Sequence, residues 1–200
     1  MFKIIPFISY VFVVTFTPGP NNIISFINAR EFGYKKSLKF MLGIFSGFII
    51  IMLLSSYFNL LLYNLIPKIE VYMGVTGAVY MSYLALKLIR GKSKGKQHYD
   101  QRVNTFFTGI LLQFVNPKVI LYGITIMANF IIPHYKSNIA FLSFSVLLAA
   151  VSFVSISCWA LFGIVFREFL ARHEKPFNIV MGILLLYSAY SISGIGNLFN

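Results

Sequence analysis

The chain has 200 residues, of which 58% are hydrophobic and only 11% charged, and its formal net charge is +12. A soluble domain of this length cannot bury so much apolar surface with so few charges, so composition excludes an ordinary soluble protein and indicates an all-α integral membrane protein. The basic residues lie between apolar stretches, which indicates membrane topology and contact with anionic membrane lipids, and we expect no nucleic-acid partner.

Six apolar stretches are candidate membrane spans. A helix needs about 20 predominantly apolar residues to cross the hydrocarbon core. The third stretch is short, but Glu70 and Lys87 can lie at the two interfaces and extend it. The sequence predicts six transmembrane helices in a single domain over residues 1–200, at 4–29, 40–67, 69–89, 103–133, 137–166 and 177–200.

The first predicted span contains a proline break, Thr17-Pro18-Gly19-Pro20-Asn21-Asn22. Proline lacks a backbone donor and clashes with the preceding turn, so the carbonyls of Val14 and Phe16 lose their helical partners. We expect Gly19 to allow a sharp turn and a new half-helix to start at Pro20. In a bilayer, such irregular backbone is tolerated only inside protein or along a cavity.

Charge placement predicts the orientation of the helices. Both termini are expected outside and the loops after helices 1, 3 and 5 in the cytoplasm, because cytoplasmic loops carry an excess of Lys and Arg. Three basic residues mark the outer side, namely Lys3, Lys68 and Lys136. The cytoplasmic side has thirteen: Arg30, Lys35, Lys36, Lys39, Lys87, Arg90, Lys92, Lys94, Lys96, Arg102, Arg167, Arg172 and Lys175.

A polar cytoplasmic linker, 91–104, divides the chain into two halves, 1–90 and 105–200. Each half contains three predicted spans, and three is odd, so the second half enters the membrane from the opposite side. We therefore predict two inverted three-helix repeats, an arrangement found in many secondary transporters.

The fourth predicted span repeats the proline break at Asn116-Pro117-Lys118, in the position that Pro18 has in the first. Pro117 frees the carbonyl of Gln113. Amides at the two half-helix starts favour a carboxylate, and the exposed carbonyls favour an ammonium group. Helices 1 and 4 are thus predicted to be broken around a binding site for a small molecule. The candidate binding residues are Thr17, Pro18, Gly19, Pro20, Asn21, Asn22, Gln113, Asn116, Pro117 and Lys118.

Lys118 is the one strongly ionisable residue in the middle of a predicted span, and no carboxylate in the spans can pair with it. Intramembrane charges are costly and usually functional, so Lys118 is a candidate for pairing with a substrate carboxylate or for carrying a proton. The alternative is that Lys118 snorkels or bonds the freed carbonyls.

Other features favour helix packing. Gly43 and Gly47 form a small-xxx-small pattern. A stripe of small residues at 145, 149, 152 and 155 suits packing better than pathway lining. Cys158 is the only cysteine and the three histidines lie in different predicted loops, so we expect no metal site and no cofactor.

The two breaks together resemble the lysine-exporter (LysE/RhtB) family of amino-acid translocators. Thr17-Pro18-Gly19-Pro20-Asn21 and Asn116-Pro117-Lys118 carry the resemblance, and Ala29-Arg30, Gly33, Lys35, Lys36, Gly43 and Gly47 add to it. It implies a secondary exporter in the cell membrane, not an enzyme, that moves amino acids or close analogues outward on a proton or ion gradient. Members that handle basic amino acids often carry intramembrane acidic residues, and none is present here, which favours a neutral amino acid.

Other functions have less support. A thiol–disulfide carrier needs two cysteines, and a metal exporter needs soft or acidic ligands within the spans. A passive channel or a membrane scaffold remains the alternative, because broken and glycine-rich helices occur in both, and a homo-oligomer stays open.

Overall fold

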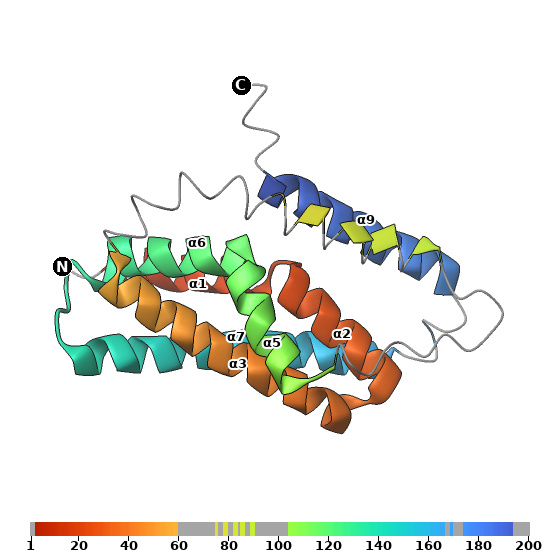
Figure 1. The fold of residues 1–200 in the computed structure, drawn as a ribbon, viewed down its shortest axis with the longest axis horizontal. Coiled ribbons are helices and arrows are strands. Elements are labelled where there is room, and N and C mark those ends of the chain that lie inside the picture. Colours follow the sequence, from red (N-terminus) through yellow and green to blue (C-terminus); the bar gives the residue numbers. More distant parts are fainter. Residues whose placement is uncertain are drawn as a thin grey trace, which may run out of the picture.

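The computed structural model describes residues 3–59, 104–166, 169 and 174–193, together with scattered positions from 75 to 90. Every regular element in this part of the chain is a helix (Figure 1). The α-helices are α1 (Ile4–Phe16), α2 (Pro20–Phe32), α3 (Tyr34–Tyr57), α5 (Phe106–Val115), α6 (Pro117–Ile126), α7 (Asn138–Val165) and α9 (Glu174–Ser193). A π-helical turn, η2 (Met127–Ile131), continues α6.

Both predicted breaks are present. The axes of α1 and α2 differ by 47°, and those of α5 and the α6–η2 segment differ by 67°. Pro20 and Pro117 each occupy the first turn of the helix that follows. A backbone amide in this turn has no partner within the helix, so proline, which lacks the N–H, costs no hydrogen bond there. In the described residues, α3 and α7 are long and apolar enough to cross a membrane, and each bent pair can form one further span.

The remaining predicted spans are only partly visible. Span 69–89 and linker 91–104 lie mostly outside the described residues, although the described positions from 75 to 89 are helical. Helix α9 covers most of the last predicted span and starts three residues earlier. The six-span layout and the inverted repeat therefore stay predictions.

The boundary between the first two predicted spans was wrong. We expected a loop between residues 29 and 40, but α2 continues to Phe32 and α3 starts at Tyr34, so that Gly33 alone connects them. Lysine is a good helix former whose stem can lie along apolar surface, and Lys35, Lys36 and Lys39 therefore extend α3 instead of forming a loop.

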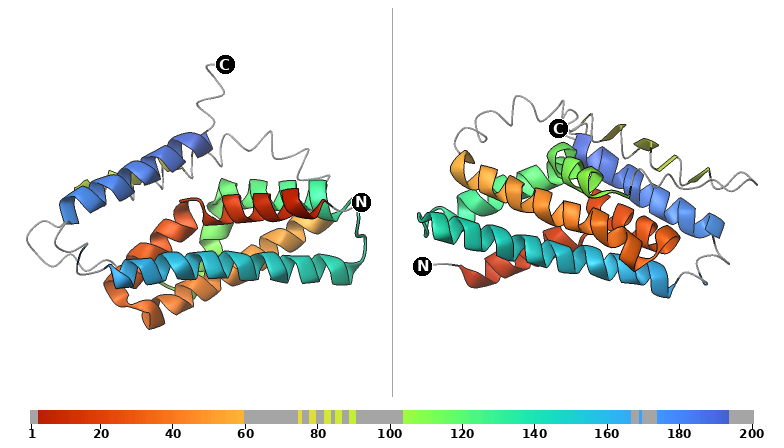
Figure 2. Two further views of the ribbon diagram at one scale, coloured as in Figure 1. Left: turned by 180° about the vertical axis from the view of Figure 1, so that it is seen from behind. Right: turned by 60° about the horizontal axis from the view of Figure 1, so that its bottom comes forward.

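Two hydrophobic cores lie along helices α3 and α7, which pack against each other and run side by side in the right view of Figure 2. In one core, Phe48 and Met52 of α3 and Leu148 of α7 pack with α1, α6 and η2. In the other, Phe40 and Ile44 of α3 and Ile156 of α7 pack with α2, α5 and α9. The two broken helices thus change direction at the level where one core gives way to the other.

Glycines let α3 and α5 cross with their backbones in contact. A Cβ atom on Gly43 would lie 2.0 Å from the carbonyl oxygen of Phe106, and one on Gly109 would lie 2.2 Å from that of Phe40. A Cβ on Gly47 would meet the Gln113 side chain at 2.8 Å. This confirms the packing role predicted for Gly43 and Gly47, since small residues allow close approach of membrane helices. The crossing fixes α5, and hence the second break, against α3.

Candidate functional site

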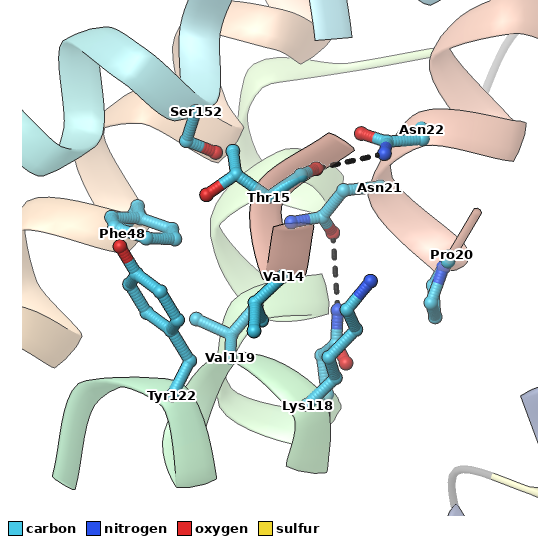
Figure 3. A pocket seen from close by; sticks show the side chains of 12 residues that line it. Val14, Thr15, Pro20, Asn21, Asn22, Phe48, Lys118, Val119, Tyr122 and Ser152 are labelled. Carbon is cyan, nitrogen blue, oxygen red and sulfur yellow. Dashed lines mark hydrogen bonds between the residues drawn. The ribbon is translucent and has the colours of Figure 1, made fainter. Parts of the chain in front are cut away.

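A cavity lies at the level of the two breaks (Figure 3). It encloses about 380 Å³ of space that no protein atom fills, a volume that includes the solvent at its open mouth. Helices α1, α2, α3, α6 and α7 all contribute to the wall, so segments distant in sequence converge there. The residues that line it are Val14, Thr15, Gly19, Pro20, Asn21, Asn22, Phe48, Asn116, Lys118, Val119, Tyr122 and Ser152.

Six of the ten predicted site residues line this cavity: Gly19, Pro20, Asn21, Asn22, Asn116 and Lys118. The other four, Thr17, Pro18, Gln113 and Pro117, lie beside it without forming its wall. Thr17 and Gln113 bond to lining residues, and the two prolines set the backbone geometry. The predicted set therefore gathers at one place but divides into lining and supporting residues.

Three side-chain amides join the two breaks. Asn21 Nδ2 donates to Gln113 Oε1 at 2.8 Å, and Gln113 Nε2 donates back to Asn21 Oδ1 at 3.2 Å. Asn116 Nδ2 donates to the same Asn21 oxygen at 3.3 Å, which Figure 3 shows as a dashed line. All three residues are buried, and Asn116 is 2% exposed. The side-chain oxygen of Asn116, Oδ1, has no hydrogen-bond partner within the described residues.

The carbonyls freed at the first break are bonded by side chains from elsewhere. Asn22 Nδ2 donates to the carbonyls of Thr15 and Thr17, at 3.0 and 2.9 Å. Ser155 of α7 donates its hydroxyl to Thr15 O at 3.0 Å, and Trp159 donates to Phe16 O at 3.4 Å. We expected the carbonyls of Val14 and Phe16 to face a ligand, but Phe16 O accepts from Trp159 and Val14 O accepts from the Thr17 hydroxyl at 3.3 Å. Buried carbonyls take protein donors when donors are in reach.

Lys118 spans the gap between the breaks. Its Nζ donates to the carbonyl oxygen of Thr17 at 3.1 Å, which is the alternative contact considered for this residue. An ammonium group has three N–H donors, so this bond leaves capacity for a ligand in the cavity. Among the residues that the structure describes, no carboxylate forms an ion pair with it.

Gly19 leaves room for a neighbouring side chain and does not form a turn. Its φ of −167° and ψ of 176° describe extended backbone that any residue adopts, so the predicted sharp turn is wrong. A Cβ at this position would lie 3.1 Å from Lys118 Nζ and 3.3 Å from Lys118 Cδ. The missing side chain thus gives the lysine its place beside the first break.

The half-helix starts at α2 and α6 lack a side-chain cap, as do the starts of α1 and α3, whereas α5 and α7 have one. Thr105 and Ser137 cap α5 and α7 by accepting bonds from Thr108 N and Ala140 N. No side chain among the described residues caps α2 or α6, whose first turns face the cavity. Uncapped first-turn amides carry partial positive charge, which suits an anionic group.

Sequence reasoning missed six lining residues: Val14, Thr15, Phe48, Val119, Tyr122 and Ser152. Tyr122 follows Lys118 by four residues and so lies on the same face of α6, a spacing that pointed to it. Ser152 was assigned to packing, but it lies between the two cores and lines the cavity, whereas Ser155 supports the first break. Which face of α3 meets the cavity depends on tertiary packing, and no local signal marked Phe48.

The sequence profile of the LysE type translocator family matches residues 12–192. The chain belongs to the LysE type translocator family. Cysteine/O-acetylserine efflux proteins from Klebsiella pneumoniae, Escherichia coli and Shigella flexneri are each 33% identical over 186 residues, covering 93% of this chain and 94%, 95% and 95% of theirs. No solved structure matches the chain.

Membership of the LysE family confirms the resemblance seen in the two breaks. The protein is a membrane transporter for amino-acid substrates and not an enzyme, as its family and relatives indicate. Both motifs that carried the resemblance lie inside the matched range, at the two breaks that border the cavity.

Proposed function

We propose that this LysE family protein exports small neutral amino acids across the cell membrane, with cysteine and O-acetylserine as substrates. The efflux proteins named for these two compounds align over nearly the whole chain. The observation that carries the proposal is the cavity at the two breaks, which combines one cation, several amides and no acidic lining residue. A basic amino acid would bring a second positive charge toward Lys118 with no carboxylate to balance it.

The polar end of the cavity supports one orientation of the substrate. The α-carboxylate accepts from the Lys118 ammonium and the uncapped first turns of α2 and α6, where positive partial charge is concentrated. The α-ammonium donates to Asn116 Oδ1, a buried oxygen without a partner in the described residues. Each charged group of the substrate then meets a complementary group.

We further propose that transport uses the proton or ion gradient and that the two halves form inverted repeats around this site. One broken helix from each half, with its second segment starting at a proline, supports this arrangement. The proposed orientation places the short link between α2 and α3 in the cytoplasm. The basic Lys35, Lys36 and Lys39 at the start of α3 support it, with the anionic lipid surface as their partner.

Purified protein in proteoliposomes tests the proposal. Vesicles loaded with cysteine under reducing conditions, or with O-acetylserine, should lose substrate faster than vesicles without protein. An imposed proton or ion gradient should drive the substrate against its concentration difference. Simple equilibration would favour a passive channel. Absence of any flux for both compounds would contradict the substrate assignment and favour a scaffold role.

A further inference from the structure

Tyr122 presents a buried hydroxyl group to the cavity. The residue is 3% exposed and lines the cavity, and its hydroxyl makes no hydrogen bond of normal geometry among the described residues, with the Thr15 side chain as its polar neighbour. A buried polar atom without a partner loses its hydration and gains nothing in return, so such atoms in folded proteins need an explanation. One such explanation is a ligand that forms the missing hydrogen bond.

The ring of Tyr122 is held in place by other aromatic side chains. It stacks on Tyr10 with ring centroids 5.8 Å apart and planes inclined by 3°, and it packs against Phe48 at 5.7 Å. A ring confined on two sides keeps its hydroxyl in one position. The hydroxyl is therefore a fixed donor and not a mobile one.

Lys118 and Tyr122 mark two ends of the cavity. In Figure 3, they lie on either side of Val14 and Val119, and Thr15 and Ser152 lie near the tyrosine end. When the α-carboxylate of an amino acid lies at Lys118, its side chain passes the two valines toward the hydroxyl end. The group that meets Tyr122 is then the far end of the substrate side chain.

We infer that Tyr122 selects for an O-acyl side chain by donating its hydroxyl to the ester carbonyl oxygen. This inference rests on the proposed function and assigns a specificity-determining residue to it. An ester carbonyl is a good acceptor, whereas a thiol is a weak donor and a weak acceptor. The same hydroxyl therefore stabilises bound O-acetylserine more than bound cysteine.

The test is the substitution Tyr122→Phe, which removes one oxygen and keeps the ring. In proteoliposomes, the ratio of O-acetylserine flux to cysteine flux at subsaturating concentration should fall about 3- to 10-fold, as expected for one lost hydrogen bond. Tyr10→Phe is the matched control, because it removes a hydroxyl from the ring stacked on Tyr122 but outside the cavity wall. It should leave the ratio unchanged.

The outcomes separate the two proposals. An unchanged ratio in Tyr122→Phe, or an equal loss of both fluxes, would overturn the selectivity role while leaving the substrates in place. A wild-type protein that moves neither compound would overturn the proposed function and this inference with it. A ratio that falls in Tyr122→Phe but not in Tyr10→Phe supports the inference.

Discussion

The two proline breaks look alike in sequence and differ in how their polar groups are used. At the first break, three residues separate α1 from α2, and side chains of Asn22, Ser155 and Trp159 bond the carbonyls of Thr15, Phe16 and Thr17. At the second break, Asn116 alone separates the helices, and its backbone amide bonds Gln113 O at 3.4 Å.

The polar groups of the first break are mainly bonded to one another and to α7, whereas the second break has polar groups that are free to bind a ligand. The side-chain oxygen of Asn116 has no partner in the described residues, and Lys118 uses only one of its donors. Substitutions at the bracing groups should therefore affect stability, and substitutions at the second break should affect transport. Three experiments test this difference between the breaks, in order of decreasing expected effect.

Lys118→Gln should have the largest effect. Removing a charge-assisted hydrogen bond to a carboxylate costs about 1.5–3 kcal/mol, so transport at low substrate concentration should fall about 10- to 150-fold. Protein yield and unfolding should change little, because Asn22 still donates to the Thr17 carbonyl when the lysine is replaced. Lys136→Gln, at an exposed position away from the cavity, controls for the loss of a charge. Wild-type affinity in Lys118→Gln would show that the lysine only braces Thr17.

Asn21→Ala should lower the stability of both breaks together, because Asn21 bonds Gln113 and Asn116 at once. It leaves the fully buried Oε1 of Gln113 without its partner, while Nε2 keeps its bond to Gly109 O, at a cost of about 2 kcal/mol in the free energy of unfolding. Denaturant unfolding in detergent measures this. Asn129→Ala is the control, since exposed Asn129 bonds only one carbonyl, in its own helical segment. Equal losses in the two variants would contradict the linking role of Asn21.

The smallest effect should separate two serines one turn apart on α7. Ser155→Ala removes the hydroxyl that bonds Thr15 O and should lower the free energy of unfolding by about 1 kcal/mol. Ser152→Ala changes a cavity-lining residue that bonds no freed carbonyl in the described residues, and its stability should stay close to wild type. The same unfolding assay compares them. Equal stability of both variants would mean that the first break does not depend on bracing from α7.

The backbone was more predictable from sequence than the use of side chains. Proline acts locally, so Pro18, Pro20 and Pro117 located both breaks, and their neighbours provided half of the cavity wall. The sequence does not show whether a polar residue beside a break faces the cavity or bonds a neighbouring side chain. The lining residue Asn116 could therefore not be distinguished from Gln113, which lies outside the cavity wall. Gly19 was predicted for the wrong reason because its role depends on a lysine 99 residues away.

The one-residue connection at Gly33 has a mechanical consequence. Gly33 has a φ of +82°, a conformation that other residues rarely adopt. Helix α2 ends just before it, and α3 begins just after it. Consecutive Cα atoms are about 3.8 Å apart, so the end of α2 cannot move away from the start of α3 by more than a few ångströms. Helix α3 is in turn in close contact with α5 at Gly43 and Gly109. We therefore expect a tilt of α2 in the first broken helix to move α3, and α3 to move α5 in the second.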